Sequence, residues 1–265
     1  MKHITFFLLF LLYAIVCSAQ IIHVPGDHST IQAAIDVAEE GDTVLVDEGR
    51  YYENLHFGSV PITLTSQFLI DGDTSHISKT IIDGSQYSDL TDASVIYIQD
   101  LPNSKAVLAG FTITGGAGTL SDGNCEGGGI YVTNCGCTIR NNIIEKNSTD
   151  GYGAGGSASQ LNLGVSDTLY FFENNVRYND VQGESQSGGP IGIFSGKNCL
   201  IRFSGNIISN NISRSSGYYK ILGGGMYIVT GYSYGNDIQI YNNIISHNEI
   251  HMQSSHGGGI YVVYG

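Results

Sequence analysis

The sequence predicts an all-β fold, a single-stranded parallel β-helix in which the chain winds through successive coils of short strands. Two repeating signatures predict it. A triple-glycine turn precedes a strand at residues 127–132, 223–228 and 257–262, with a degenerate copy at 188–193. An asparagine-rich segment is marked by Asn142, Asn175, Asn206 and Asn243, which lie 33, 31 and 37 residues apart. Repeats of this length, built from short β-runs and turn residues, are typical of solenoids.

Residues 1–19 are the expected signal peptide. Lys2 supplies a positive start, an apolar run extends from Phe6 to Val16, and small residues precede Gln20. The run is too short for a membrane span, which needs about 20 residues. We therefore expect cleavage after Ala19 and a secreted or cell-surface protein, with lipid attachment at Cys17 as the alternative.

The charge of the chain excludes several partners. Without residues 1–19 it carries 10 basic and 24 acidic residues, a formal charge of −14. Nucleic acid and anionic membranes both need clustered Lys and Arg, so neither is expected. A polyanionic polysaccharide is also a poor ligand unless Ca²⁺ bridges the two sets of acids.

Residues 20–57 are expected to form an N-terminal cap. Ser29 followed by Gln32 is the pattern of a capping box, and Gly41 is a stop signal, so a short capping helix is predicted between them. Its apolar stripe consists of Ile31, Ala34, Ile35 and Ala38. The first coil of a solenoid has nothing stacked beneath it and needs such a cover.

Three segments of this cap carry a family resemblance: residues 30–35 (TIQAAI), 41–46 (GDTVLV) and 49–54 (GRYYEN). They resemble the N-terminal cap of the pectin-lyase-like superfamily, which includes pectinesterases and polysaccharide lyases. The later repeats are similar to those of polymorphic outer-membrane proteins. The resemblance implies a right-handed β-helix and, for some members, activity on carbohydrates.

Residues 58–265 show no linker and are expected to form the coils of one domain. The chain stops at Gly265 inside a repeat, so the helix is expected to be truncated at its C-terminal end. Ile260 and Val262 would then have no coil over them, which predicts end-to-end self-association.

Alternation predicts which side chains face inward in the strand before each marker asparagine. The expected inward pairs are Cys137/Ile139, Tyr170/Phe172, Ile201/Phe203 and Ile238/Ile240. The markers Asn142, Asn175, Asn206 and Asn243 should stack as a structural asparagine ladder at one corner. A second polar position follows five residues later, at Asn147, Asp180, Asn211 and Asn248. Arg140 and Glu173 would share one outward position and form an ion pair.

The strand after each glycine turn suggests a ligand-binding surface. Tyr131, Tyr227 and Tyr261 should face outward in one column, with Ala158 and Gly192 between them if residues 155–156 begin the degenerate coil. Such a trough, with a floor of small residues and tyrosines at its ends, would suit stacking of sugar rings. The alternative is that tyrosine is simply a good strand residue.

Catalytic and metal signals are sparse. Asp71 and Asp73 could present oxygens to Ca²⁺, although the spacing of a complete calcium loop is absent. Lyases of the resembled superfamily use a groove Arg or Lys beside Ca²⁺-binding carboxylates, but Arg140, Arg177 and Arg202 do not converge. Cys135 and Cys199 lie two coils apart, so no disulfide is expected between them.

Two hypotheses remain. The first is a secreted or surface β-helix that binds polysaccharide or surface glycan, or is adhesive, without a complete catalytic site. The alternative is a carbohydrate-active enzyme, a lyase or esterase, whose site is completed by coils beyond Gly265.

Overall fold

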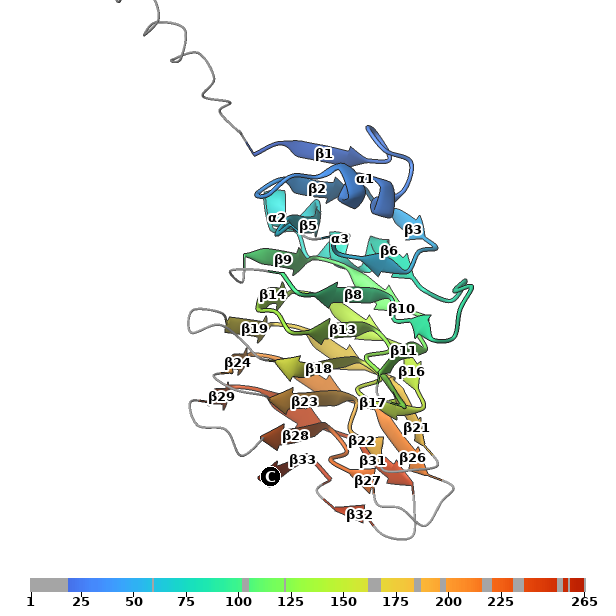
Figure 1. Cartoon of the computed structure of the whole chain (residues 1–265), viewed down its shortest axis with the longest axis vertical. Helices are drawn as coiled ribbons and strands as arrows, with labels where there is room; N and C mark the ends of the chain where they lie inside the picture. Colours follow the sequence, from blue (N-terminus) through green and yellow to red (C-terminus); the bar gives the residue numbers. More distant parts are fainter. Residues whose placement is uncertain are drawn as a thin grey trace, which may run out of the picture.

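The computed structural model describes residues 19–58, 60–101, 105–121, 123–161, 168–183, 187–195, 199–215, 221–230, 236–251, 255–256 and 258–264. The chain forms a right-handed parallel β-helix, as predicted, with its coils stacked from β1 to β33 in Figure 1. Residues 1–18, which cover the expected signal peptide except Ala19, lie outside the described residues.

Sheets A and B form two walls of the rod. Sheet A consists of β1 (Ile21–Val24), β2 (Thr43–Val46), β5 (Thr63–Ser66), β9 (Ala106–Ala109), β14 (Cys137–Arg140), β19 (Thr168–Phe172), β24 (Leu200–Ser204) and β29 (Asp237–Tyr241). Sheet B consists of β3 (Gly49–Tyr51), β6 (Thr80–Asp83), β10 (Thr112–Thr114), β15 (Ile143–Glu145), β20 (Asn175–Arg177), β25 (Ile207–Ser209) and β30 (Ile244–Ser246).

Sheet C forms a third wall. It consists of β4 (Leu55–His56), β8 (Ile96–Gln99), β13 (Ile130–Thr133), β18 (Gly156–Leu161), β23 (Ile191–Ser195), β28 (Met226–Thr230) and β33 (Ile260–Tyr264). Sheet E continues sheet B through β16 (Ser148–Thr149), β21 (Asp180–Gly183), β26 (Ile212–Ser215) and β31 (Glu249–His251).

Two small sheets precede the strands of sheet C along the chain. Sheet D consists of β7 (Asp92–Ala93), β11 (Gly118–Ser121), β12 (Asn124–Glu126) and β17 (Gly151–Tyr152), and sheet F of β22 (Ser187–Gly188), β27 (Ile221–Leu222) and β32 (Ser255–His256). In sheet D, β11 pairs antiparallel with both β12 and β7. This hairpin therefore departs from the simple coil.

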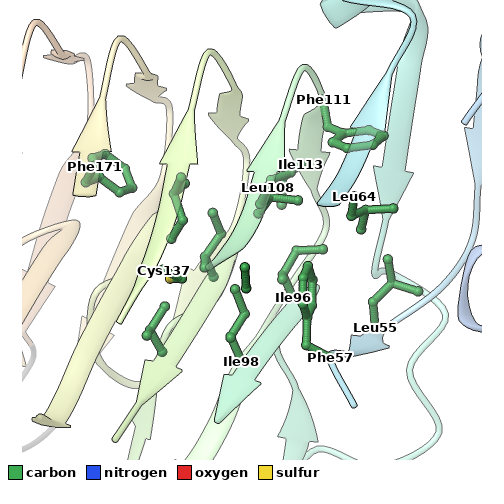
Figure 2. Close-up of a cluster of buried hydrophobic side chains, with 14 of the residues drawn as sticks. Leu55, Phe57, Leu64, Ile96, Ile98, Leu108, Phe111, Ile113, Cys137 and Phe171 are labelled. Carbon is green, nitrogen blue, oxygen red and sulfur yellow. The ribbon is translucent and has the colours of Figure 1, made fainter. Parts of the chain in front are cut away.

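The core lies between the three walls. In sheet B the inward row runs through register-matched residues of five coils, Ile82, Ile113, Ile144, Val176 and Ile208, all of them buried. Figure 2 shows Leu64 and Leu108 of sheet A and Ile96 of sheet C pointing into the same interior. Each coil thus adds one inward side chain to each row, and the rows build a continuous apolar stack.

Helix α1 (Ile31–Val37) covers the first coil, with Ile31, Ala34 and Ile35 buried beneath it. Its N-cap is Thr30 and not the expected Ser29, since the Thr30 hydroxyl accepts from the Ala33 backbone N–H. The Glu53 carboxylate accepts from the N–H groups of Ile31 and Gln32, each at 2.9 Å. This carboxylate satisfies two of the unpaired donors of the first turn, so Ser29 is not needed there.

Two further short helices, α2 (Phe68–Asp71) and α3 (Ser75–Lys79), lie on the outside of sheets A and B near the cap. No helix in the described ranges is long and apolar enough to cross a membrane. In the last coil, Ile260 and Val262 are exposed. Whether this leads to end-to-end association stays a prediction.

Asparagine side chains stack at the corner between sheets A and B. The backbone N–H of each ladder residue donates to the side-chain oxygen of the next: Asn142 to Asn174 at 3.0 Å, Asn174 to Asn206 at 2.9 Å, and Asn206 to Asn243 at 2.9 Å. The amide nitrogens also donate to backbone carbonyls, as Asn174 does to Ile139 at 2.9 Å. The ladder therefore pairs the buried backbone at this corner.

The prediction that Asn175 belongs to this ladder is wrong, because Asn174 occupies that position. Asn175 begins β20, and its side-chain oxygen is buried without a hydrogen-bond partner. The residue before each ladder asparagine has a left-handed backbone: Asn141, Glu173, Gly205 and Asn242 have φ of 55°, 56°, 67° and 54°. Since Glu173 takes this turn position, the next residue must be the ladder asparagine.

A second asparagine ladder lies at the following corner. There too, the expected residue of one coil is shifted by one position. It consists of Asn147, Asn179, Asn211 and Asn248, so Asn179 and not the expected Asp180 is the second member. The Asn147 N–H donates to Asn179 at 3.1 Å, and the Asn179 N–H donates to Asn211 at 3.0 Å. Both ladders thus repeat at the same spacing.

The same one-residue shift changes the facing in β19. Leu169 and Phe171 are buried, while Tyr170 and Phe172 face outward, the reverse of the prediction. Phe171 stacks on Phe203 with ring centroids 4.8 Å apart and nearly parallel. One residue of slip in a strand moves every side chain to the other face.

The expected ion pair between Arg140 and Glu173 is wrong for the same reason. Arg140 is opposite Phe172, and Glu173 instead accepts a hydrogen bond from the Asn141 amide at 3.0 Å. Cys125, Cys135, Cys137 and Cys199 are not joined by disulfides.

Candidate functional site

The predicted tyrosine column exists on sheet C, but its composition differs from the expectation. Register pairs Tyr131 with Ser157, Ser157 with Gly192, Gly192 with Tyr227, and Tyr227 with Tyr261. Ala158 is therefore not in the column; it is paired with Val132 and Ile193. The column also begins earlier, at His56 and Tyr97.

The prediction misplaced Ala158 because of the turn that precedes it in the sequence. The backbone bonds from Gly128 to Gly153 and from Ile130 to Gly155 match residues 127–129 with residues 153–155. Gly153 has φ of 65°, close to the 62° of Gly127. Because Ala154 stands in the middle of this turn, the glycine pattern alone placed the column residue one position too late, at Ala158 and not at Ser157.

In the part of the chain that the structure describes, no open trough lies between Tyr131 and Tyr227. Their side chains are 2% and 7% exposed. Tyr152 of β17 stacks on Tyr227 with centroids 5.8 Å apart and makes an edge contact with Phe194 at 4.9 Å. The side chain of Tyr152 therefore takes the place that a sugar ring would need beside Tyr227.

Sheet D also contributes a buried carboxylate to this closed region. Glu126 of β12 accepts a hydrogen bond from the Ser157 hydroxyl at 3.0 Å. Burial raises the pKa of Tyr152, and the nearby Glu126 adds to the shift. Burial, with Tyr152 and Tyr261 nearby, raises the pKa of Tyr227 to about 12. Tyr227 is buried and Tyr152 is half-buried, so little of either ring is left for a sugar to stack on.

The candidate calcium residues Asp71 and Asp73 are held by local hydrogen bonds. Asp71 accepts from the Asp73 N–H, and Asp73 from the Ser75 N–H, both at 2.8 Å. His76 lies between Glu48 at 2.8 Å and Asp71 at 3.1 Å, so the carboxylates raise its pKa. Within the ranges that the structure describes, no group of three or more His, Cys, Asp or Glu side chains is placed to hold a metal ion.

The three candidate arginines Arg140, Arg177 and Arg202 lie apart, and each donates to a neighbouring side chain. Arg177 pairs with Glu145 at 2.8 Å, and Arg202 with Asp237 at 2.6 Å. Arg140 donates to the Asn141 side chain at 3.0 Å. The arrangement brings no arginine to the tyrosine column.

An open groove of ≈330 Å³ lies at the head of the column, where sheet C begins. It is lined by Tyr52, Glu53, Asn54, His56, Gln86, Tyr87, Ser88, Asp89 and Asp92. Tyr52 is 50% exposed, and the Arg50 guanidinium carbon lies 6.0 Å from its ring centroid. His56 packs edge-on against Tyr97 at 5.3 Å. The groove is thus the place where the aromatic column meets solvent.

The acids of this groove have structural partners. Asp92 pairs with His56 at 3.0 Å, which joins β7 to β4 across the groove. Asp89 accepts from the backbone and hydroxyl of Thr91, both at 2.8 Å, and these bonds lower its pKa. Glu53 caps α1. The groove is negatively charged, because three acids and no lysine or arginine line it.

Sequence reasoning missed this groove because its residues come from segments outside the repeat. Tyr52 and His56 belong to the first coil, and Tyr87 and Asp89 lie in the loop between β6 and β7. One residue could have indicated the groove from the sequence. His56 is a polar, outward-facing residue of a short strand that ends just before Gly58. No family model matches the chain, and no curated protein is found to be similar in sequence.

Proposed function

We propose that this chain is an exported member of the pectin-lyase-like β-helices that binds neutral glycan and catalyses no reaction on it. The observation that carries the proposal is the groove at the head of sheet C. It combines an exposed aromatic ring, Tyr52, with the carboxylates and amides of Asp89, Asp92 and Gln86. Sugars present apolar ring faces and hydroxyl edges, which match these two kinds of group.

The charge of the groove selects among glycans. Asp89 is held ionised by Thr91, and Asp92 faces His56. A uronate-rich polysaccharide would bring further negative charge to this site and be repelled. Neutral sugars, whose hydroxyls donate to carboxylate oxygens, are therefore the proposed ligands.

Each acid of the groove already has a structural partner, which favours binding without catalysis. Glu53 holds the first turn of α1, Asp89 holds its own loop, and Asp92 is paired with His56. A general acid or base must lie within hydrogen-bond reach of the proton that it exchanges with the substrate. Binding makes no such demand.

The test is calorimetric titration with a panel of soluble neutral oligosaccharides. Tyr52→Ala should weaken binding about tenfold, since an aromatic contact is worth about 0.5–1.5 kcal/mol, and should leave the melting temperature unchanged. Tyr178→Ala is the matched control, because Tyr178 is 54% exposed but lies beyond sheet B. A wild-type protein that binds none of the panel refutes the proposal.

An assay for new reducing ends or released ester groups on the same glycans separates binding from catalysis. Product formation by the wild type would favour the enzyme hypothesis over the binding one.

A further inference from the structure

The outer face of sheet A beyond α2 carries a regular grid of side chains. One outward column consists of Thr138, Tyr170, Arg202 and Gln239, and the other of Arg140, Phe172, Ser204 and Tyr241. In Figure 1 the strands β14, β19, β24 and β29 follow one another down one side of the rod. The grid is therefore a flat wall parallel to the rod axis.

Aromatic rings are exposed on this wall. Tyr170 is 41% exposed and Tyr241 is 49% exposed, while Phe172 is half-buried. Phe172 and Tyr241 share a column and lie two strands apart, about 9.6 Å at the usual spacing. The residue between them is Ser204, which is small. The rings therefore stand above the wall with a gap between them, along the rod axis.

Polar groups separate the rings. The Arg202 guanidinium donates to the Asp237 carboxylate at 2.6 Å and to the Asp237 carbonyl at 3.0 Å. The Gln239 amide donates to the same carboxylate at 3.3 Å. The charge of Arg202 is thus balanced within the wall. Separate rings among hydrogen-bonding groups do not make the continuous apolar patch that a protein interface core uses.

We propose that this wall is a second carbohydrate-binding surface, which takes a neutral, extended polysaccharide laid along the rod axis. The rings stack on the flat faces of alternate sugar units. Arg202, Gln239 and Ser204 meet the hydroxyl edges between them. A neutral chain fits because the ring faces and the hydrogen-bonding groups of the wall need no charge on the ligand, and the Arg202 charge is already paired with Asp237.

This surface is independent of the groove at Tyr52, because sheet A and sheet C are different walls of the rod. The groove is suited to a few sugar units in solution, whereas the wall is suited to a long chain or a solid surface.

The experiment measures depletion of the protein from solution by suspensions of microcrystalline cellulose and of chitin. The double variant Tyr170→Ala/Tyr241→Ala should bind at least one of the solids about tenfold more weakly than the wild type. Tyr178→Ala, an equally exposed tyrosine outside the wall, should bind within about twofold of the wild type. Thermal unfolding of each variant checks that the fold is intact.

Two results overturn the proposal: a wild type that both solids leave in solution, or a double variant that binds as well as the wild type. The separate Tyr52→Ala variant should lose binding to soluble oligosaccharides and keep most of its binding to the solid. Its behaviour in the calorimeter therefore tests the groove, and the depletion assay tests the wall.

Discussion

The corner between sheets A and B and the outer face of sheet C are built by the same coils but filled in different ways. At the corner, every regular coil supplies the same residue type, from Asn142 to Asn243, and the side chains bond to one another. On sheet C, register-matched positions hold His56, Tyr131, Ser157 and Gly192. The repeated asparagines at the corner satisfy backbone hydrogen bonds, whereas the varied side chains on sheet C leave room for other parts of the chain to pack there.

On sheet C, the outer face of the tyrosine column is covered by residues from another sheet. Small residues at positions 157 and 192 leave space beside Tyr227, and Tyr152 of sheet D fills it. Among the described residues, the column is open at its head, beside Tyr52 and His56, and Tyr261 at its other end is half-buried. A column of outward tyrosines is therefore not in itself a binding surface, and the strands that precede each coil decide whether it is.

The largest expected effect is in the core beneath the ladder corner. Phe203 stacks on Phe171, and its carbonyl accepts a hydrogen bond from Asn243 at 3.0 Å. Phe203→Ala should cost about 3–5 kcal/mol in the free energy of unfolding. Ser204→Ala, on the outward side of the same strand, should cost little. Equal urea midpoints for the two variants would mean that the register of β24 is wrong.

The ladder itself is tested by a pair of neighbouring asparagines. Asn174→Ala removes the acceptor of the Asn142 N–H and the donor to the Ile139 carbonyl, both buried. The expected cost is about 3 kcal/mol, because each buried unpaired group costs about 1–3 kcal/mol.

Asn175→Ala is the matched control and should change stability by less than about 0.5 kcal/mol, since the Asn175 side-chain oxygen has no partner. Urea unfolding measures both variants. A larger loss for Asn175→Ala would restore the register expected from the sequence.

The architecture could be predicted because it repeats. Two signatures and alternating apolar residues predicted the coil, the corners and most of the core, including the inward position of Phe203, although its stacking partner is Phe171 and not the expected Phe172. Two shifts of register arose where the repeat is degenerate, at Asn174 beside Asn175 and at Ala154 within a glycine turn. In both places, two neighbouring residues could have filled the same position of the coil. Only the left-handed backbone at Glu173 or Gly153 shows which of the two does.

The candidate site could not be predicted in the same way. Contacts such as Tyr152 on Tyr227 and His56 on Asp92 join segments with no periodic relation. Pattern reasoning identifies which face a strand residue occupies, but it does not identify what packs on that face from a hairpin.

The closure of the tyrosine column should appear as a pH dependence. The pKa of Tyr227 is raised to about 12, mainly by burial, against about 10 in an unfolded chain. Its contribution to stability is complete below pH 10 and is lost as the pH rises from 10 to 12, because the unfolded chain ionises first.

Tyr227→Phe should therefore show a smaller loss of stability between pH 9 and pH 11.5 than the wild type. The exposed Tyr178→Phe should behave like the wild type. Urea midpoints at the two pH values provide the measurement. An unchanged alkaline loss in Tyr227→Phe would mean that Tyr227 is open to solvent, and the trough hypothesis would return.

The smallest expected effect concerns the inner side of sheet C. Gly156 stands between Ile130 and Ile191 in register, beside an internal cavity of ≈30 Å³ that Phe171 and Phe203 also line. A Cβ built on Gly156 would lie 3.6 Å or more from its neighbours. Gly156→Ala should therefore raise the free energy of unfolding by about 0.4–1 kcal/mol, mainly by restricting the unfolded chain.

Gly155 provides the matched control, because a Cβ there would lie 2.6 Å from Cγ1 of Val176. Gly155→Ala should destabilise the protein, since the packed row of sheet B cannot retreat without opening a gap elsewhere. The two adjacent substitutions thus have opposite signs only if residues 153–155, and not 155–156, form the turn. Thermal unfolding that ranks Gly155→Ala above Gly156→Ala would contradict this register and would place Ala158, not Ser157, beside Tyr131.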